Sequence, residues 1–303
     1  MGRFFAAITI ALICGFIITA QDTEPTFRVD VKLVRAIATV KDVNGKPIGD
    51  LKKEDLIVRD NGAEQKVVLF ERHTAQPLSV AVLLDISGST AKEMKGQTEA
   101  VGRFLKALFG EGNPDDRASL WAFNWQVGQE VPWSKGAGRF TDRMKRLKAE
   151  AGTALYDAIY FASRDISDRD GRHVLVVVSD GGNTDSAKTY HQALEAAHKA
   201  DAVIYPVLTV PITADAGRNT GGEHALIQMA QTTGGKMFAP GMNGLDQAFA
   251  DILRDLRTQY LIGYYPKGVP LTRNRFHTLD IRTRDPQLRV VSRTGYYGDA
   301  DAK

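Results

Sequence analysis

Two runs of consecutive apolar residues, each leading into an aspartate, constrain the fold of this chain more than any other feature. The first run is 80–84, which Asp85 follows, and the second is 174–178, which Ser179 and Asp180 follow. Continuous apolar runs of this length are typical of strands that are buried on both faces, as in a parallel sheet covered by helices. Because ligands of such sheets collect at the carboxyl ends of the strands, both aspartates can lie over one spot.

The middle of the chain, from about residue 78 to 260, alternates between buried strands and helical segments. This alternation predicts an α/β domain with a doubly wound, mostly parallel, Rossmann-like sheet. The expected strands are 79–84, 118–124, 174–179, 203–209 and 236–238, with a short edge piece near 127–131. The expected helices are 90–109, 153–166, 187–200, 223–232 and 244–257.

The two flanks are rich in short β segments. Asn44-Gly45 and Asp60-Asn61-Gly62 are strong hairpin signals in the front flank. Strands are expected at 29–42, 56–59 and 65–70 in front, and at 260–264, 276–283 and 288–292 behind. Each flank is too short for its own core. We therefore expect one small β-sandwich, built from 21–74 and 260–303, into which the domain 75–259 is inserted.

The first 20 residues predict an export signal. Arg3 supplies the positive start, 4–18 the apolar stretch, and Ala20 a cleavage site before Gln21. The mature chain is then expected to be periplasmic or extracellular, whereas an uncleaved segment 4–20 would anchor it in the membrane. The single cysteine, Cys14, lies inside this segment without the small preceding residue that lipidation requires, so the mature chain would have no disulfide.

Composition excludes several classes of function. A hydrophobic content of 43% and a charged content of 25% indicate a globular protein with a full core. The net charge of +3 comes from scattered residues, without the basic stripe that nucleic-acid binding requires. The loop after the first buried strand has neither Gly-x-Gly-x-x-Gly nor Gly-Lys-Thr, which disfavours nucleotide binding.

Five oxygen-bearing side chains follow a plan for binding a hard cation. Mg²⁺ prefers oxygen ligands in octahedral geometry and keeps several waters, so few carboxylates and several hydroxyls suit it, and Mn²⁺ is the alternative. A divalent ion with three neutral hydroxyl ligands retains positive character and should accept a carboxylate from outside. The candidate ligands are Asp85, Ser87 and Ser89 of Asp85-Ile-Ser87-Gly-Ser89, then Thr153 and Asp180.

Asp-x-Ser-x-Ser, followed by a Thr and then an Asp, closely resembles the metal-ion-dependent adhesion site of von Willebrand factor A-type domains. The resemblance implies a non-enzymatic, adhesion-type module whose metal binds a Glu or Asp of a partner protein, with the two acids often reaching the metal through water. The segments 51–62, 260–264 and 293–297 look like those of the VWFA-related proteins abundant in Acidobacteria. Thr90-Ala-Lys92-Glu93 replaces the acidic pair of a second ion site in integrin β-subunits, so no second ion is expected.

Other interpretations of the motif stay open. Asp-x-Ser-x-Ser alone can be a helix N-cap, and the complete pattern can be a metal-free copy. The chain can also be a structural or assembly subunit of the cell envelope with a stabilising metal. A metal-dependent hydrolase is a minor alternative, since Ser87 stands where phosphatases with a strand-end nucleophile carry a second Asp, and no Gly-x-Ser-x-Gly elbow is present.

Two further groups of residues are candidates for other sites. His191, Glu195 and His198 fall on one face of an expected helix, which suggests a surface zinc site, although a solvated face is the favoured interpretation. The aromatic residues Trp121, Trp125 and Trp133, and likewise Tyr296 and Tyr297, could stack on a ligand, but packing is favoured for them.

The last helix of the inserted domain is expected to dock on the sheet and to lead directly into the C-terminal β segment. Asn243 is the expected N-cap. Related A-type domains move this helix when a ligand completes the metal shell, so the resemblance implies a two-state element, and a fixed core helix is the simpler alternative. Its apolar stripe consists of Leu245, Phe249, Ile252, Leu253, Leu256 and Tyr260.

Overall fold

The computed structural model describes residues 33–72, 76–209, 220–269 and 275–298. The expected export signal lies outside these residues. None of the helices within the described ranges is long and apolar enough to span a bilayer.

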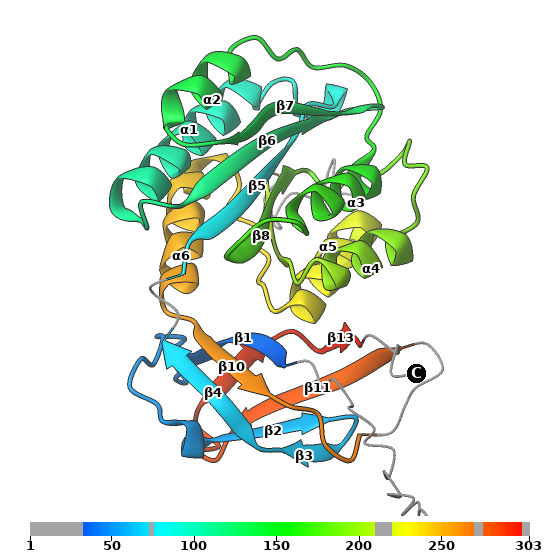
Figure 1. Cartoon of the computed structure of the whole chain (residues 1–303). Helices are drawn as coiled ribbons and strands as arrows, with labels where there is room; N and C mark the ends of the chain where they lie inside the picture. Colours follow the sequence, from blue (N-terminus) through cyan, green and yellow to red (C-terminus); the bar gives the residue numbers. More distant parts are fainter. Residues whose placement is uncertain (1–32, 73–75, 210–219, 270–274, 299–303) are drawn as a thin grey trace, which may run out of the picture. The chain divides into compact units, whose positions relative to one another are not determined.

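The central feature of the inserted domain is a five-stranded sheet in the order β7-β6-β5-β8-β9 (Figure 1). Four strands are parallel, and only β7 runs antiparallel to its neighbour β6. From β5 the next strands in the chain, β6 and β7, are added on one side of the sheet, whereas β8 and β9 are added on the other side. The direction in which strands are added therefore reverses between β5 and β8. The bounds are β5 (Leu78–Asp85), β6 (Arg117–Phe123), β7 (Val127–Ser134), β8 (Arg172–Ser179) and β9 (Val203–Leu208).

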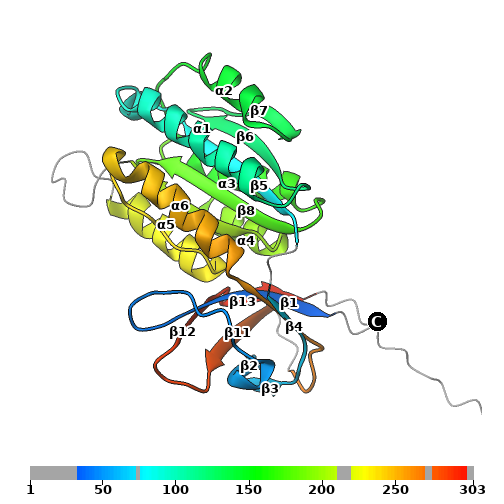
Figure 2. The ribbon, with the colours of Figure 1, turned by 90° about the vertical axis from the view of Figure 1, so that its left-hand side faces the viewer.

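Helices cover both faces of this sheet, which is why β5 is buried along its whole length (Figure 2). Val80, Val82 and Leu84 point to one helical layer, whereas Ala81 and Leu83 point to the other. The first layer contains α1 (Met94–Glu111), α2 (Ala137–Met144) and α6 (Leu245–Arg257). The second contains α3 (Leu155–Ile166), α4 (Tyr190–Lys199) and α5 (Thr220–Thr233).

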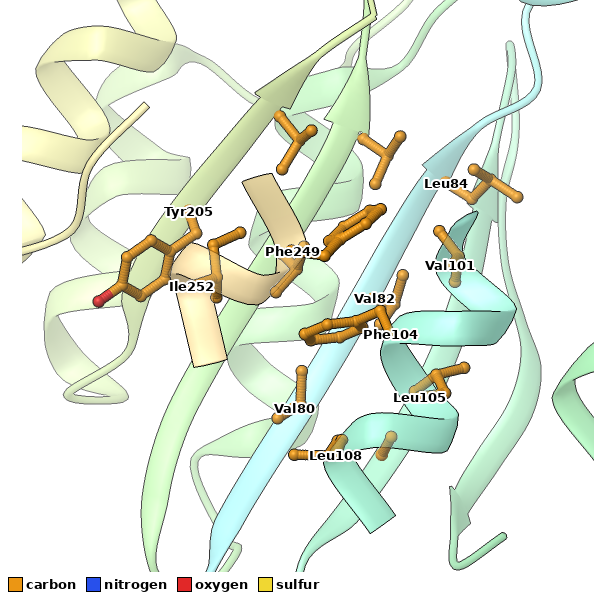
Figure 3. Packing of buried hydrophobic residues seen from close by; sticks show 14 of the residues in the cluster. Val80, Val82, Leu84, Val101, Phe104, Leu105, Leu108, Tyr205, Phe249 and Ile252 are labelled. Atoms are coloured by element: carbon orange, nitrogen blue, oxygen red, sulfur yellow. The ribbon is translucent and has the colours of Figure 1, made fainter. Parts of the chain in front are cut away.

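Helices α1 and α6 interlock over β5 and β8 (Figure 3). The rings of Phe104 and Phe249 meet with their centroids 5.0 Å apart. Burial of each such side chain stabilises the fold by about 1.5 to 3 kcal/mol. The expected apolar stripe of α6 packs into this core, because Leu245, Ile252 and Leu256 are also buried there. Its last expected member, Tyr260, instead begins β10 and packs in the sandwich core.

The flanks form two four-stranded sheets, and each sheet combines strands from both ends of the chain. The first has the order β12-β1-β10-β4 and the second the order β13-β11-β2-β3. Apolar side chains from both sheets share one core. The bounds are β1 (Val34–Lys41), β2 (Leu56–Asp60), β3 (Ala63–Gln65), β4 (Val67–Arg72), β10 (Tyr260–Tyr264), β11 (Phe276–Thr283), β12 (Arg289–Ser292) and β13 (Gly295–Tyr297). The predicted fold class is therefore confirmed.

Several local predictions were wrong. The segment 236–238 makes only an isolated bridge between Val207 and Phe238, and is not a strand. Asn243 does not cap α6; it lies in a short 3-10 turn, Met242–Gly244, and the N-cap is Gly244 without a side-chain hydrogen bond. Helix α2 was not expected at all. Its eight residues make only about two turns, which is too short for two buried side chains to distinguish a helix from a loop.

The helix after the aspartate motif also begins later than expected. Residues Gly88–Thr90 form a 3-10 turn, and α1 begins only at Met94. The Thr90 hydroxyl donates to the backbone carbonyls of Asp85 and Ser87 at 3.1 and 3.0 Å. Such local side-chain hydrogen bonds compete with helix formation. They stabilise the turn after Asp85 and delay the start of α1. A second 3-10 turn, Lys53–Asp55, precedes β2.

Candidate metal centre

Three loops meet where the strand order of the central sheet reverses. The first follows Asp85 at the end of β5, the second precedes α3, and the third follows Ser179 at the end of β8. Ligands of open α/β sheets bind in the crevice at this point of the topology. The five predicted ligands are all located on these loops: Asp85, Ser87, Ser89, Thr153 and Asp180.

Asp85 is fully buried, and both of its carboxylate oxygens are held. Oδ1 accepts a hydrogen bond from the backbone N–H of Ser87 at 2.9 Å. Oδ2 accepts one from the hydroxyl of Ser179 at 2.6 Å. The hydroxyls of Ser87 and Ser89 lie 3.0 Å apart, with Ser87 buried and Ser89 exposed. The motif therefore forms a row of oxygens that leads from the sheet to the surface.

The loop before α3 lies alongside the aspartate motif. The backbone N–H of Glu150 donates to the carbonyl of Ile86 at 3.0 Å, and Glu150 also bridges to Ser87. A Cβ placed on Gly88 would lie 3.9 Å from Cα of Ala151. This contact carries Thr153, two residues further on, to the same edge of the sheet.

Thr153 is held by the loop that follows β8. Its backbone N–H donates to Oγ1 of Thr184 at 3.0 Å and to Oδ2 of Asp185 at 3.1 Å. Its carbonyl accepts from the backbone N–H groups of the same two residues at 2.8 and 3.1 Å. Hydrogen bonding to Thr184 and to Thr153 lowers the pKa of Asp185, which keeps this carboxylate charged. The backbone of Thr153 is thus fixed on both sides.

Gly152, just before Thr153, needs to be glycine. Its φ of +86° lies in the left-handed region that side chains rarely adopt. A Cβ at this position would also lie 2.7 Å from both Cβ of Trp125 and Oδ2 of Asp185. The close approach brings the exposed ring of Trp125 to the rim of the site.

Asp180 and Thr153 both lie next to Gly182. A Cβ placed on Gly182 would be 3.1 Å from Oδ1 of Asp180 and 3.6 Å from Oγ1 of Thr153. Oδ1 of Asp180 also accepts the backbone N–H of Gly182 at 2.9 Å. The structure therefore brings the carboxylate of Asp180 and the hydroxyl of Thr153 together.

The charge of this site is uncompensated. Burial raises the pKa of Asp85 to about 6, the donors Ser179 and Ser87 lower it, and the like charge of Asp180 raises it again. Neither Asp85 nor Asp180 forms an ion pair with a Lys or Arg among the described residues. Two carboxylates without a basic partner favour a bound cation.

The donor set matches a hard divalent ion. All five candidate ligands offer oxygen, and only two of them are acids, which suits Mg²⁺ or Mn²⁺ better than zinc. Within the described ranges, no group of three or more His, Cys, Asp or Glu side chains could hold a metal ion. The predicted site has only two acids, so this finding does not test it, and metal binding stays a prediction.

The alternative zinc site is not formed. His198 is buried, 5% exposed, and its ring meets those of Phe276 and Tyr297. His198 therefore shares neither a zinc site nor a solvated helix face with His191 and Glu195. The favoured interpretation, a solvated face, was wrong for His198. Its burial comes from strands of the β-sandwich, which local helix periodicity cannot reveal.

Some of the aromatic candidates are packed as expected, and one is exposed. Trp121 is buried, and Nε1 of Trp133 donates to Asp165 at 2.7 Å, so both serve packing as expected. Tyr296 is likewise buried in the sandwich core. Trp125, in contrast, is 53% exposed in the loop between β6 and β7, and the packing expected for it is absent.

Sequence reasoning missed three residues that support the site. Ser179 holds Asp85, and Thr184 and Asp185 hold Thr153. The position of Ser179 directly before Asp180 was a usable signal, because a hydroxyl at the end of β8 lies next to the end of β5. The roles of Thr184 and Asp185 depend on a contact between two loops, and the sequence carried no signal for it.

Comparisons with known proteins agree with the topology. Residues 80–183 match the family model for the von Willebrand factor type A domain. No curated protein sequence matches the chain. Proximal thread matrix protein 1 from the mussel byssus has a similar structure, with 16% identity and a TM-score of 0.51 over 65% of this chain and 51% of that chain. At this identity the likeness concerns the fold alone.

Two bacterial structures are also similar over most of their own length. One is the von Willebrand factor domain of the type V pili tip protein Mfa5 from Porphyromonas gingivalis, with 12% identity and a TM-score of 0.48 over 59% of this chain and 95% of that chain. The other is an aerotolerance-related membrane protein from Bacteroides fragilis, with 16% identity and a TM-score of 0.47 over 59% and 98%.

Proposed function

We propose that residues 80–183, which match the family model for the von Willebrand factor type A domain, belong to a protein-interaction module centred on a divalent metal. Domains of this type generally mediate protein–protein interactions. The metal is Mg²⁺ or Mn²⁺, and the partner offers an Asp or Glu carboxylate. Its ligands in the chain are Asp85, Ser87, Ser89, Thr153 and Asp180.

One arrangement supports this proposal above the others: the buried carboxylate of Asp85 accepts the hydroxyl of Ser179, the residue directly before Asp180, so two acids with hydroxyls beside them end neighbouring strands. An N-cap needs no second aspartate. A metal-free copy would leave two like charges next to each other at the end of a buried strand, which is unfavourable. A divalent cation removes this cost.

The residues of the site have separate tasks in this proposal. Ser179 and the backbone of Ser87 hold the Asp85 carboxylate in one orientation. Asp185 holds the backbone of Thr153. The exposed hydroxyl of Ser89 marks the open side of the site. A bound divalent ion supplies an electrophilic coordination position there, which an incoming carboxylate oxygen fills. This is binding chemistry, and we propose no catalytic step.

Trp125 extends the proposed contact surface beyond the metal. It is 53% exposed and lies against the backbone at Gly152, one residue from Thr153. Tryptophan is enriched among the residues that carry most of the affinity of a protein interface. The partner's acidic side chain is therefore expected to lie beside an apolar group that covers the indole.

A titration of Mn²⁺ into the exported form of the protein, followed by calorimetry, tests the metal centre. Wild type should bind one ion, and Thr153→Ala should bind it about tenfold or more weakly. Thr98→Ala on α1 is the matched control and should bind as wild type does. Equal binding by wild type and by an Asp85→Ala, Asp180→Ala double variant would refute the centre.

A second experiment separates an adhesion module from an envelope subunit with a stabilising metal. The protein is used to capture partners from an envelope fraction in Mg²⁺ and in EDTA, with Thr153→Ala in parallel. We expect wild type to capture partners in Mg²⁺ and not in EDTA. The Thr153→Ala variant should capture none, although its melting temperature in EDTA should equal that of wild type. A variant that still captures partners but melts at a lower temperature in Mg²⁺ would favour the structural subunit.

A further inference from the structure

A cavity of about 280 Å³ lies at the opposite end of β8 from the metal centre. Its walls come from the start of β8, the end of α6 and strands β1 and β10 of the sandwich. Since β8 has eight residues, its two ends are roughly 23 Å apart at about 3.3 Å per residue. The cavity is therefore separate from the proposed metal site.

Arg172, the first residue of β8, contributes a buried guanidinium to this cavity and is 7% exposed. Nη1 donates to the carbonyl of Leu256, and also to Oε1 of Gln259 at 2.9 Å. Both acceptors are neutral. Nε has no hydrogen-bond partner among the described residues. A buried charge that is held only by neutral oxygens, with one donor left over, is unfavourable without a counter-ion.

The nearest carboxylate that acts on Arg172 is already occupied. Asp116 accepts the backbone N–H groups of Leu78 at 2.7 Å and Asn113 at 3.0 Å. Burial lowers the pKa of Arg172 to about 10, and the charge of Asp116 raises it again only in part. Arg172 therefore lacks a full ionic partner within the described part of the chain.

A second buried guanidinium lines the same cavity. Arg293 is 9% exposed, and it donates to Asp201 and to the carbonyl of Arg35. Its Nε also has no partner among the described residues. Two buried cations, one on the α/β domain and one on the sandwich, thus line one cavity, and each has an Nε–H without a partner among the described residues. The volume of the cavity is several times the share of a single water, about 30 Å³.

We propose that this cavity binds a small oxyanion of the phosphate class through Arg172 and Arg293. Guanidinium groups are well suited to oxyanions because their N–H donors fit two oxygens at once. The anion would supply the charge that Arg172 lacks and would accept N–H groups from both guanidiniums. It would also bridge the end of α6, which Arg172 holds through Leu256, to the sandwich residue Arg293.

Arg35 offers a variant that should leave the fold intact. It is an exposed residue of β1 that lines the cavity, and only its backbone carbonyl accepts from Arg293. Arg35→Glu places a negative charge beside the cavity and should weaken phosphate binding about tenfold. Arg282→Glu, an equal charge change at an exposed position of β11 outside the cavity lining, is the matched control and should change the affinity little.

The experiment is a calorimetric titration of inorganic phosphate into the metal-free protein in EDTA, with sodium chloride at matched ionic strength. We expect saturable binding and a higher melting temperature in wild type and in Arg282→Glu, and about tenfold weaker binding in Arg35→Glu. Arg172→Met should abolish binding, and if this variant does not fold, the Arg35→Glu and Arg282→Glu pair decides. Acetate in place of phosphate shows whether a carboxylate suffices.

Three outcomes would overturn the site. Wild type could show no saturable binding, or Arg35→Glu and Arg282→Glu could weaken it equally, which would indicate a diffuse surface effect. Loss of phosphate binding in the Asp85→Ala, Asp180→Ala variant would place the anion at the other end of β8. Because metal is absent throughout, failure here leaves the proposed metal centre untouched.

Discussion

The hydroxyl of Ser179 donates a 2.6 Å hydrogen bond to Oδ2 of Asp85, and this bond joins the end of β8 to the end of β5. Both residues are fully buried. The bond fixes the direction of a carboxylate that would otherwise rotate about its last torsion. Residues that orient a ligand in this way typically contribute 10- to 100-fold to metal affinity.

Replacement of Ser179 by Ala tests this relationship. We expect the variant to fold and to bind Mn²⁺ about tenfold more weakly in calorimetry. Ser163→Ala is the matched control, because Ser163 is equally buried and its hydroxyl has no hydrogen-bond partner among the described residues. It should leave metal affinity unchanged. Wild-type affinity in Ser179→Ala would show that Asp85 needs no such support.

Asp185 is expected to act on the metal only through Thr153. Its Oδ2 accepts the backbone N–H of Thr153 at 3.1 Å, and Asp185→Ala removes that acceptor. Mn²⁺ affinity should fall by about threefold to tenfold, less than for Thr153→Ala, because the exposed Asp185 carboxylate holds only the backbone of Thr153. Asp185→Asn, which keeps an acceptor, should recover most of the loss. Failure of the Asn variant to recover affinity would indicate that the charge itself matters.

The sequence predicted the parts of this structure that depend on runs of apolar residues. The strand before Asp85 and the strand before Asp180 are buried on both faces, so neither face needs polar residues and the apolar run is unbroken. The sandwich followed from turn signals and from the small size of each flank. Both arguments use short stretches of chain, in which the residues that cause the structure are also the residues that form the sequence pattern.

The wrong predictions have different causes. Asn243 has the right side chain for an N-cap, but the chain makes a 3-10 turn there and α6 begins after Gly244. His198 falls on a polar helix face in the sequence, but strands from the C-terminal flank cover it. Trp125 is exposed because its loop packs its backbone, not its ring, against Gly152. The outcomes for His198 and Trp125 depend on residues that are distant in the sequence, whereas the outcome for Asn243 depends on a local turn.

The sandwich core contains a buried polar group that should contribute measurably to stability. Asp60 is fully buried and accepts hydrogen bonds from the hydroxyls of Tyr264 at 3.0 Å and Tyr296 at 2.6 Å. Tyr264→Phe and Tyr296→Phe should each lower the free energy of unfolding by about 1 to 3 kcal/mol. Urea denaturation measures this. The exposed Tyr265→Phe serves as the control. Surface substitutions usually change the free energy of unfolding by no more than about 0.5 kcal/mol. Core variants whose loss differs from that of the control by less than this would contradict a stabilising role of the Asp60 hydrogen bonds.

Phe249 is expected to be a main contact of α6. It is 2% exposed and stacks near Phe104 in the core over β5 (Figure 3). Phe249→Ala should destabilise the protein by about 3 to 5 kcal/mol, because the cavity left behind cannot collapse fully. Phe161→Ala on α3, where the ring is 43% exposed, should cost much less. Similar losses in the two variants would show that α6 is only loosely docked.

His198 should make stability depend on pH. Burial, helped by the charge of Arg293, lowers its pKa from 6.5 to about 4, and Asp201 opposes this only partly. The unfolded state therefore binds the proton first as the pH falls. Stability from the neutral ring is complete above pH 6.5 and is lost progressively between pH 6.5 and 4, up to about 3 kcal/mol at 1.36 kcal/mol per pKa unit.

The His198→Gln variant isolates this effect from the carboxylates that titrate in the same range. Both proteins are unfolded in urea at several pH values between 4 and 7.5, and the difference in unfolding free energy is plotted against pH. We expect wild type to lose stability more steeply than the variant below pH 6.5, because only wild type has a ring that must stay neutral to fold. Parallel curves would mean that the ring can be protonated in place, and that the contacts of His198 with Phe276 and Tyr297 open readily to water.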